Sequence, residues 1–273
     1  SSQDMDLELM LPEGFSSETK SLKLNLAGKA KQPFSFTVTT PKSANLSRGA
    51  RQSAKIIYNF ADSWKGDMDV PISLAVKMDG GRMDENLPDF SLTTHESVYN
   101  FSEKDPNMVN KSWNGPADLG AKIWLGKKDG KLLLKVDVTD DIHFQKDKGA
   151  NIWRSDSIQL AFVIPGQEGY WEIGLARLAD GSSQIVAWSI PKGMKDPSQE
   201  IGLKTTAKVG SLVYEAEFPY ESMGFSDKIL SSGIRFNLIV NDDDGNGRKG
   251  WVQIAPGIGE SKNPELYPGI SMQ

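Results

Sequence analysis

The chain contains no cysteine, only two histidines and no long apolar run. The missing cysteine excludes disulfide frameworks, thiol catalysis and zinc–thiolate sites. No stretch approaches the roughly 18 consecutive apolar residues of a membrane-spanning helix, so we expect no membrane span. The first residues also lack the basic start and apolar stretch of a signal peptide, which is typical of a mature or trimmed soluble chain.

The chain also has no excess of basic over acidic residues. Lys and Arg number 31 against 36 Asp and Glu, a net charge of -5, so we expect no nucleic-acid partner. With only His95 and His143, the remaining catalytic options are a Ser/His pair or paired carboxylates, and no spacing in the sequence singles out either. We therefore expect no intrinsic activity, although the chain could be the accessory part of a glycoside hydrolase or polysaccharide lyase.

What the sequence does contain is typical of a folded, turn-rich protein: 273 residues, 26 Gly, 14 Pro and 38% hydrophobic residues. Apolar residues recur with period two in short runs, which predicts an all-β fold, and the length suits two tandem β-sandwich domains. A polar, Gly-containing stretch follows residue 78, so we place the boundary near residue 90, giving domains 1–90 and 91–273. Strands expected in the first domain, an immunoglobulin-like sandwich, are Asp6–Met10, Ser21–Leu26, Pro33–Thr39, Ser53–Phe60 and Pro71–Met78.

The second domain is expected to be a larger sandwich with eight strands. They are Gly120–Gly126, Lys131–Val138, Asp156–Val163, Tyr170–Ala176, Gln184–Ile190, Leu212–Phe218, Gly233–Val240 and Trp251–Ile254. One helical turn is expected after the sixth of these, at Glu221–Gly224.

Three segments of this half resemble the carbohydrate-binding modules of family 9. The first runs from Trp113 to Leu119 and continues through the strand at Leu132–Val138 to Asp140–His143. The second is Trp153–Leu160, similar to the family's W-x-x-D-S-V-E/Q signature, and the third is Phe236–Asp242, followed by Lys262-Asn263-Pro264. Their order is kept over residues 91–273, which makes the match more specific than one short motif.

The resemblance implies a sugar-binding site in which aromatic rings cover the apolar face of a pyranose and polar groups bond its hydroxyls. In this family two Trp residues enclose one terminal sugar, and the first of them corresponds to Trp153. Ser261 holds the place of the second Trp, Gln159 that of a carboxylate, and Ile239 that of a polar residue. We name Trp153, Gln159 and Asn241 as the candidate sugar-binding residues and, with one stacking ring, expect weak affinity.

Two acidic sets could hold a structural Ca²⁺. Asp242, Asp244 and Asn246 follow the D-x-D-x-N-G spacing of a calcium loop, although an acidic hairpin turn explains the same residues. Asp140, Asp141 and Asp156 form the second set, and family members often hold structural calcium. A more distant relative of this sandwich holds haem between Met and His, which makes His143 conceivable as an axial ligand, without any attachment motif to support it.

The sequence therefore predicts a non-catalytic carbohydrate-binding protein or module that is secreted, periplasmic or on the surface of a bacterial cell. The alternative is a structural or spacer segment of a larger secreted polysaccharide-degrading enzyme, with no ligand of its own and with other domains of that enzyme as its partners.

Overall fold

The computed structural model describes residues 2–12, 15–27, 33–39, 52–60, 64–72, 76–78, 86–104 and 112–272. The chain divides into two compact units, Ser1–Ser73 and Leu74–Gln273. This division falls earlier than the boundary expected near residue 90. The reason is that β5 (Val76–Met78) pairs in parallel with β17 (Gly269–Met272), so it belongs to a sheet of the second unit.

The first unit contains a four-stranded antiparallel sheet in the order β2-β1-β3-β4. Its strands are β1 (Ser2–Met10), β2 (Ser21–Ala27), β3 (Gln52–Phe60) and β4 (Trp64–Ile72). Alternate apolar side chains form a small core of Leu7, Leu9, Leu24, Ala54 and Ile56.

Two strand predictions for this unit need correction. The strand expected at Pro33–Thr39 is wrong, because within it the structure has only one isolated bridge, from Thr39 to Ser16. The strand expected at Pro71–Met78 is wrong as one element, because Pro71 and Ile72 end β4, Val76–Met78 form β5 in another sheet, and residues 73–75 lie outside the described residues. The rest of β4 was not predicted, because Gly66 breaks its apolar pattern. The immunoglobulin-like sandwich itself stays a prediction, since the described residues of this unit form one sheet.

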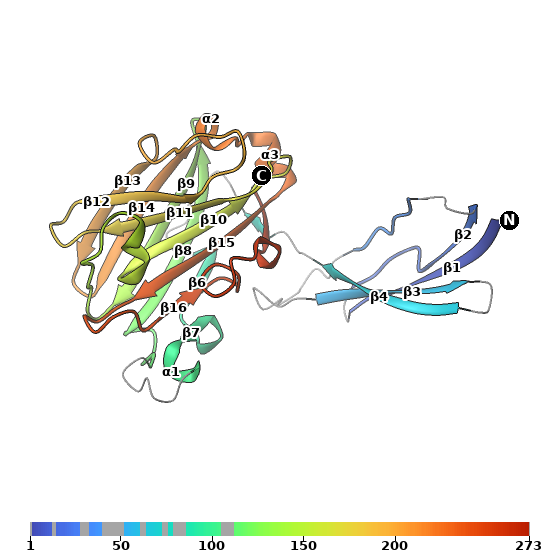
Figure 1. The fold of residues 1–273 in the computed structure, drawn as a ribbon, viewed down its shortest axis with the longest axis horizontal. Coiled ribbons are helices and arrows are strands. Elements are labelled where there is room, and N and C mark those ends of the chain that lie inside the picture. The colour runs from blue at the N-terminus through green and yellow to red at the C-terminus, as the bar shows by residue number, and fades with distance from the viewer. Residues whose placement is uncertain are drawn as a thin grey trace. The chain divides into compact units, whose positions relative to one another are not determined.

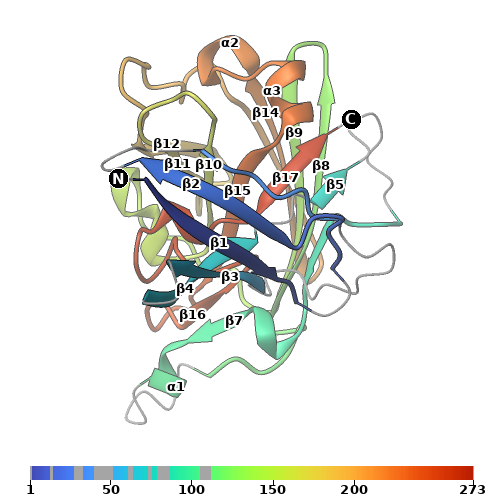
Figure 2. The same cartoon turned by 90° about the vertical axis from the view of Figure 1, so that its right-hand side faces the viewer.

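The second unit is a β-sandwich of an eight-stranded and a five-stranded sheet (Figures 1 and 2). The larger sheet runs β12-β11-β10-β15-β16-β7, with β17 beside β15 and β5 beside β17. Its remaining strands are β12 (Ser183–Ser189), β11 (Trp171–Arg177), β10 (Ser157–Val163), β15 (Ile234–Asp242), β16 (Gly250–Gln253) and β7 (Val98–Asn100). The smaller sheet runs β13 (Gly202–Lys208), β14 (Ser211–Pro219), β9 (Lys131–Asp140), β8 (Leu119–Lys128) and β6 (Phe90–Leu92).

All eight strands predicted for this unit are confirmed, and their ends agree to about two residues. The unpredicted strands are β6, β7, β13 and β17. Three of these have only three or four residues, and β13 is mostly polar, so none carries a clear alternation of apolar residues.

Helices are few and short. Among the described residues they are α1 (Phe101–Lys104), α2 (Tyr220–Met223), α3 (Asp227–Ser232), η1 (His95–Ser97), η3 (Gly149–Arg154) and η4 (Pro264–Leu266). The helical turn expected at Glu221–Gly224 is confirmed by α2. Over the described residues, no helix combines the length and the apolar character that crossing a bilayer requires.

The core of the second unit lies between the two sheets. On β9, Leu132, Leu134 and Val136 point inward and alternate with more exposed residues, which is the pattern of a strand with one wet face. On β10, by contrast, the outward Ser157 and Gln159 are as buried as their apolar neighbours. The outward side of the eight-stranded sheet is therefore covered by chain, and polar side chains lie beneath that cover.

Candidate functional site

The side of the eight-stranded sheet that is turned away from the core is called the outer face here. Strand register places Ser157 opposite Asn241, Asn241 opposite Trp251, and Trp251 opposite Tyr99. Because directly opposed residues project to the same side of a sheet, these four side chains lie in one row on the outer face. Gln159 lies on the same face, two residues from Ser157.

Trp153 is presented beside this row by the short helix η3. The preceding Ile152 is fully buried, and its carbonyl accepts a hydrogen bond of 2.9 Å from Gln145 Nε2. Trp188 Nε1 donates to the Ala150 carbonyl at 2.9 Å, so η3 is tied to β12 as well. Held in this way, the helix leaves the Trp153 side chain outward with 36% of the residue exposed. The indole is therefore an accessible aromatic surface on an anchored turn.

Gln159 and Asn241 contact each other, but they lie beneath the surface and not at the edge of an accessible binding site. They are 3% and 1% exposed. Gln159 Nε2 donates to Asn241 Oδ1 at 3.2 Å, and Asn241 Nδ2 donates to Ser157 Oγ at 2.9 Å. Lys262 Nζ lies 3.5 Å from Gln159 Oε1 and also pairs with the buried Glu172. The two amides thus form a buried polar layer behind the accessible groups.

Arg248 links this layer to Trp153, and sequence reasoning missed it. Its Nη2 donates to Asn241 Oδ1. Its guanidinium carbon lies 5.5 Å from the centre of the Trp153 ring and 4.3 Å from that of Trp251. Its position directly after the acidic loop that ends at Gly247 could have indicated a role for Arg248. The calcium-loop spacing, however, includes only the acidic and amide residues of that loop.

Trp251, which lies in the same row, is covered and adds no second stacking surface. Trp251 is 3% exposed and stacks on Tyr99, with ring centres 4.0 Å apart and planes 8° apart. A Cβ on Gly259 would come within 2.4 Å of the Trp251 ring, so the chain at Gly259 covers it. Ser261 is exposed and Ile239 is buried against Trp251 in an apolar cluster. Neither replaces the missing stacking partner.

A second concentration of polar groups, the acidic centre, lies where strand ends of the two sheets meet: Asp140 ends β9 of the smaller sheet and Asp242 ends β15 of the larger one. We define it as Asp118, Asp140, Asp156, Asp242 and Asp244, together with Lys249 and His143. Lys249 Nζ contacts Asp118 at 2.5 Å, Asp244 at 2.8 Å and Asp242 at 3.3 Å. His143 Nδ1 lies 3.2 Å from Asp156 and 3.9 Å from Asp140. Five carboxyl groups thus share one ammonium and one imidazole.

The pKa values of the centre reflect this imbalance. Burial, followed by the neighbouring Asp156, raises the pKa of Asp140 to about 8. Burial also raises the pKa of Asp242 to about 7, although Lys249 opposes the shift. Burial lowers the pKa of Lys249, but hydrogen bonds to Asp118 and Asp244 outweigh it and the net shift is upward. The carboxylates are therefore costly to ionise unless more positive charge is present.

The structure groups the predicted metal ligands differently from the two sets expected from the sequence, and the groups overlap. Ligand atoms lie within 4.8 Å of one another in three sets: Asp140, His143 and Asp156; Asp118, Asp141 and Asp244; Asp140, Asp242 and Asp244. The structure brings Asp242 and Asp244 together, but Lys249, which was not considered from the sequence, lies between them, and Asn246 is exposed. Asp118 was not predicted as a ligand, and His143 was considered only as a ligand of haem.

Two buried oxygens make the centre fit a cation. Asp242 Oδ1 and Asp244 Oδ1 are enclosed and accept no hydrogen bond. An unsatisfied buried carboxylate oxygen is unfavourable, and hard cations such as Ca²⁺ bind such oxygens. Asp140, Asp242 and Asp244 are therefore the residues best placed to hold one. Haem ligation by His143 does not fit, because its Nδ1 faces Asp156 and its Nε2 lies 3.3 Å from the Arg177 carbonyl.

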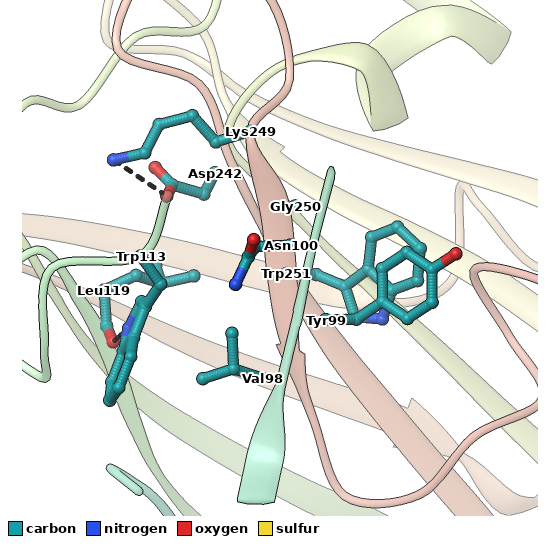
Figure 3. A pocket seen from close by; sticks show the side chains of 9 residues that line it. All are labelled: Val98, Tyr99, Asn100, Trp113, Leu119, Asp242, Lys249, Gly250 and Trp251. Carbon is teal, nitrogen blue, oxygen red and sulfur yellow. Dashed lines mark hydrogen bonds and ion pairs between the residues drawn. The ribbon is translucent and has the colours of Figure 1, made fainter. Parts of the chain in front are cut away.

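A small cavity borders the acidic centre (Figure 3). Asn100, Trp113, Asp242 and Lys249 are among its lining residues, and its volume is about 10 Å³. That is the space of about one water molecule, far below the volume of a sugar ring. The accessible surface at Trp153 is therefore the better candidate for a saccharide.

Comparison with known proteins gives structural neighbours only. No family model and no curated protein matches the sequence. The structure is similar to a carbohydrate-binding module of family 9 from Caldicellulosiruptor kristjanssonii in complex with glucose, with a TM-score of 0.47 and 14% identity, over 73% of this chain and 96% of that one. It is also similar to a family 9 module from the same organism in complex with cellotriose, with a TM-score of 0.46 and 16% identity, over 73% of this chain and 93% of that one.

Proposed function

We propose that this protein is a non-catalytic saccharide-binding protein that acts outside the cytoplasm, with Trp153 as its stacking surface. The observation that carries the proposal is the exposed indole on an anchored turn, next to a buried layer of amide groups. An aromatic face covers the C–H surface of a sugar ring, and groups fixed by their own hydrogen bonds need little reordering when a ligand arrives.

Arg248 replaces Gln159 and Asn241 as the group closest to the ligand. Its guanidinium lies beside the indole, while the two amides hold it from behind. With one accessible ring we expect a dissociation constant of roughly tens of micromolar to millimolar, at the weak end of the affinity scale.

Truncation of Trp153 tests the proposal. A glycan array followed by isothermal titration should find a saccharide whose binding is lost in Trp153→Ala. Its melting temperature should stay close to that of the wild type, because a solvent-facing ring contributes little to the core. Trp64→Ala is the matched control, since Trp64 is exposed in the other unit and its loss should leave binding unchanged.

Two results would contradict the assignment: unchanged binding in Trp153→Ala, or an array with no saturable hit. The second result would favour the alternative, a spacer segment of a larger polysaccharide-degrading enzyme. A dissociation constant in the nanomolar range would also argue against one-sided stacking.

The acidic centre has a structural role in this proposal. A Ca²⁺ ion held by Asp140, Asp242 and Asp244 would satisfy the two enclosed oxygens and stabilise the native state by mass action. Melting temperatures measured with millimolar Ca²⁺ should exceed those measured with excess chelator, and Asp242→Asn should reduce the difference. Coincident melts of the wild type in the two conditions would remove the calcium role and leave the saccharide site untouched.

A further inference from the structure

Two guanidinium groups lie against one exposed indole. The Arg154 guanidinium carbon is 5.5 Å from the centre of the Trp153 ring, and that of Arg248 is also 5.5 Å away. Arg154 is exposed and Arg248 is partly exposed, so a molecule that rests on Trp153 can reach both. The aromatic surface is therefore bordered by positive charge, although the chain as a whole has a net charge of -5.

Neither guanidinium forms an ion pair with the part of the protein that the structure describes, although Glu260 attracts Arg248 from beyond ion-pair distance. Among the described residues, no carboxylate oxygen lies within 4.0 Å of either guanidinium. Other cations of the second unit show the contrast: Lys262 pairs with Glu172, and Lys249 pairs with three carboxylates. Arg177 and Arg235 also donate to neutral groups, so the distinguishing feature of this site is that two guanidinium groups lie against one exposed ring.

Arg248 is also incompletely hydrogen-bonded. Its Nη2 donates to Asn241, but its enclosed Nε has no acceptor. Burial lowers the pKa of this guanidinium to about 10, which shows that its charge is held at a cost. A planar anion next to a guanidinium makes short, charge-assisted hydrogen bonds, and these would offset that cost.

We propose that the site at Trp153 takes an anionic saccharide, whose ring stacks on the indole while its carboxylate or sulfate group pairs with Arg248 and Arg154. This inference rests on the proposed function and adds the chemical class of the ligand. A neutral sugar offers only dipolar acceptors, which offset less of the cost of holding the Arg248 charge and make weaker hydrogen bonds to Arg154.

Matched ligand pairs test the inference. Titrations would compare galacturonate and glucuronate oligosaccharides with their methyl esters, and a sulfated oligosaccharide with its unsulfated parent. The anionic member of at least one pair should bind about tenfold more tightly at low ionic strength, because charge-assisted hydrogen bonds are roughly twice as strong as neutral ones. The difference should shrink in 0.5 M salt, since salt screens exposed charges. Comparison of the uronate and sulfate pairs identifies which anion is preferred.

Variants then locate the preference. Arg154→Gln changes an exposed side chain and should reduce the anionic preference without lowering the melting temperature, and Arg248→Gln should reduce it further. Lys208→Gln is the matched control, because it removes an exposed positive charge from β13 in the other sheet. Equal or tighter binding of the neutral members overturns the inference while saccharide binding itself stands. A preference that survives in both arginine variants also overturns it, and the absence of binding by every ligand contradicts the proposed function together with it.

Discussion

At the scale of single residues, Lys249 governs the charge balance of the acidic centre. It is 4% exposed and contacts Asp118, Asp242 and Asp244. Buried ion pairs add little net stability when complete, but breaking one leaves an uncompensated charge in a poorly solvated place. The sequence shows Lys249 only as a charged residue after a turn, and its partner Asp118 is 131 positions away. Short-range patterns cannot reveal such a contact.

Lys249→Met should therefore lower the free energy of unfolding by about 3 to 5 kcal/mol in chelator, since three carboxylates lose their ammonium partner. The control is Lys131→Met, which breaks a half-exposed pair with Glu217 and should cost at most about 1 kcal/mol. Urea denaturation of both variants measures the difference. Equal effects would mean that the Lys249 contacts are as weak as surface pairs.

Asp140 and Asp242 predict a dependence on pH. Their pKa values in the folded protein, about 8 and about 7, lie above the ordinary 3.8. Above pH 3.8 the folded state therefore keeps protons that the unfolded chain has already released. The free energy of unfolding falls as the pH rises from the ordinary pKa of 3.8 to the raised pKa values of the folded protein. In chelator, the melting temperature should drop from about pH 5 to about pH 8.5, and Asp140→Asn should flatten the drop. A melting temperature that rises over this range would show that the carboxyl groups are ionised and well compensated.

At the scale of elements, η3 decides where Trp153 points. The helix packs on β11 and β12 through Ile152 and Trp188, and the outer edge of the Trp188 ring lies over Gly174. Glycine is required there because a Cβ on residue 174 would come within 2.3 Å of the Trp188 ring and 2.9 Å of Ile152 Cδ1. Gly174 thus leaves the space in which Trp188 and Ile152 pack, and this packing fixes the position of Trp153 on η3.

Gly174→Ala should destabilise the protein by about 1 to 3 kcal/mol through overpacking, and it should also weaken saccharide binding, because Ile152 and Trp188 hold η3. Gly202→Ala provides the comparison, since the nearest atoms to its added Cβ are 3.6 Å away and its cost should stay within about 0.5 kcal/mol. If the two variants have equal melting temperatures, steric overlap of the added methyl group with Trp188 and Ile152 does not limit the stability of the protein. If binding is unchanged in a destabilised Gly174→Ala, η3 does not set the position of Trp153.

At the scale of the whole molecule, period-two patterning predicted the second unit well and the first unit less well. Long apolar strands such as β9 and β14 carry the alternation that the inner face of a sandwich imposes. Short or polar strands carry none, so β6, β7 and β13 were not predicted. The candidate site was found in part, because Trp153 precedes a recognisable strand, whereas Arg248 acquires its role only from its distance to two rings.

The position of the unit boundary can be tested with fragments. Fragment 74–273 should fold into a stable sandwich, because it contains the whole second unit. Fragment 91–273 begins at the boundary expected from sequence and lacks Phe90, which is 2% exposed in the sandwich core, as well as Asp89, which accepts a hydrogen bond from Leu125 N. Loss of a buried Phe side chain costs about 3 to 5 kcal/mol, so the shorter fragment should melt well below the longer one. Equal melting temperatures would favour the later boundary.

The span of the acidic centre also bears on how the chain folds. Asp118 meets Lys249 across 131 positions, and Asp156 Oδ1 accepts from Asp243 N across 87. Such contacts form only after large loops have closed, so on the way to the native state we expect them after the local hairpins β8–β9 and β13–β14. Interactions made after the transition state slow unfolding and leave the folding rate almost unchanged. The acidic centre would then give the folded sandwich kinetic stability, because it lowers the unfolding rate and so lengthens the lifetime of the native state.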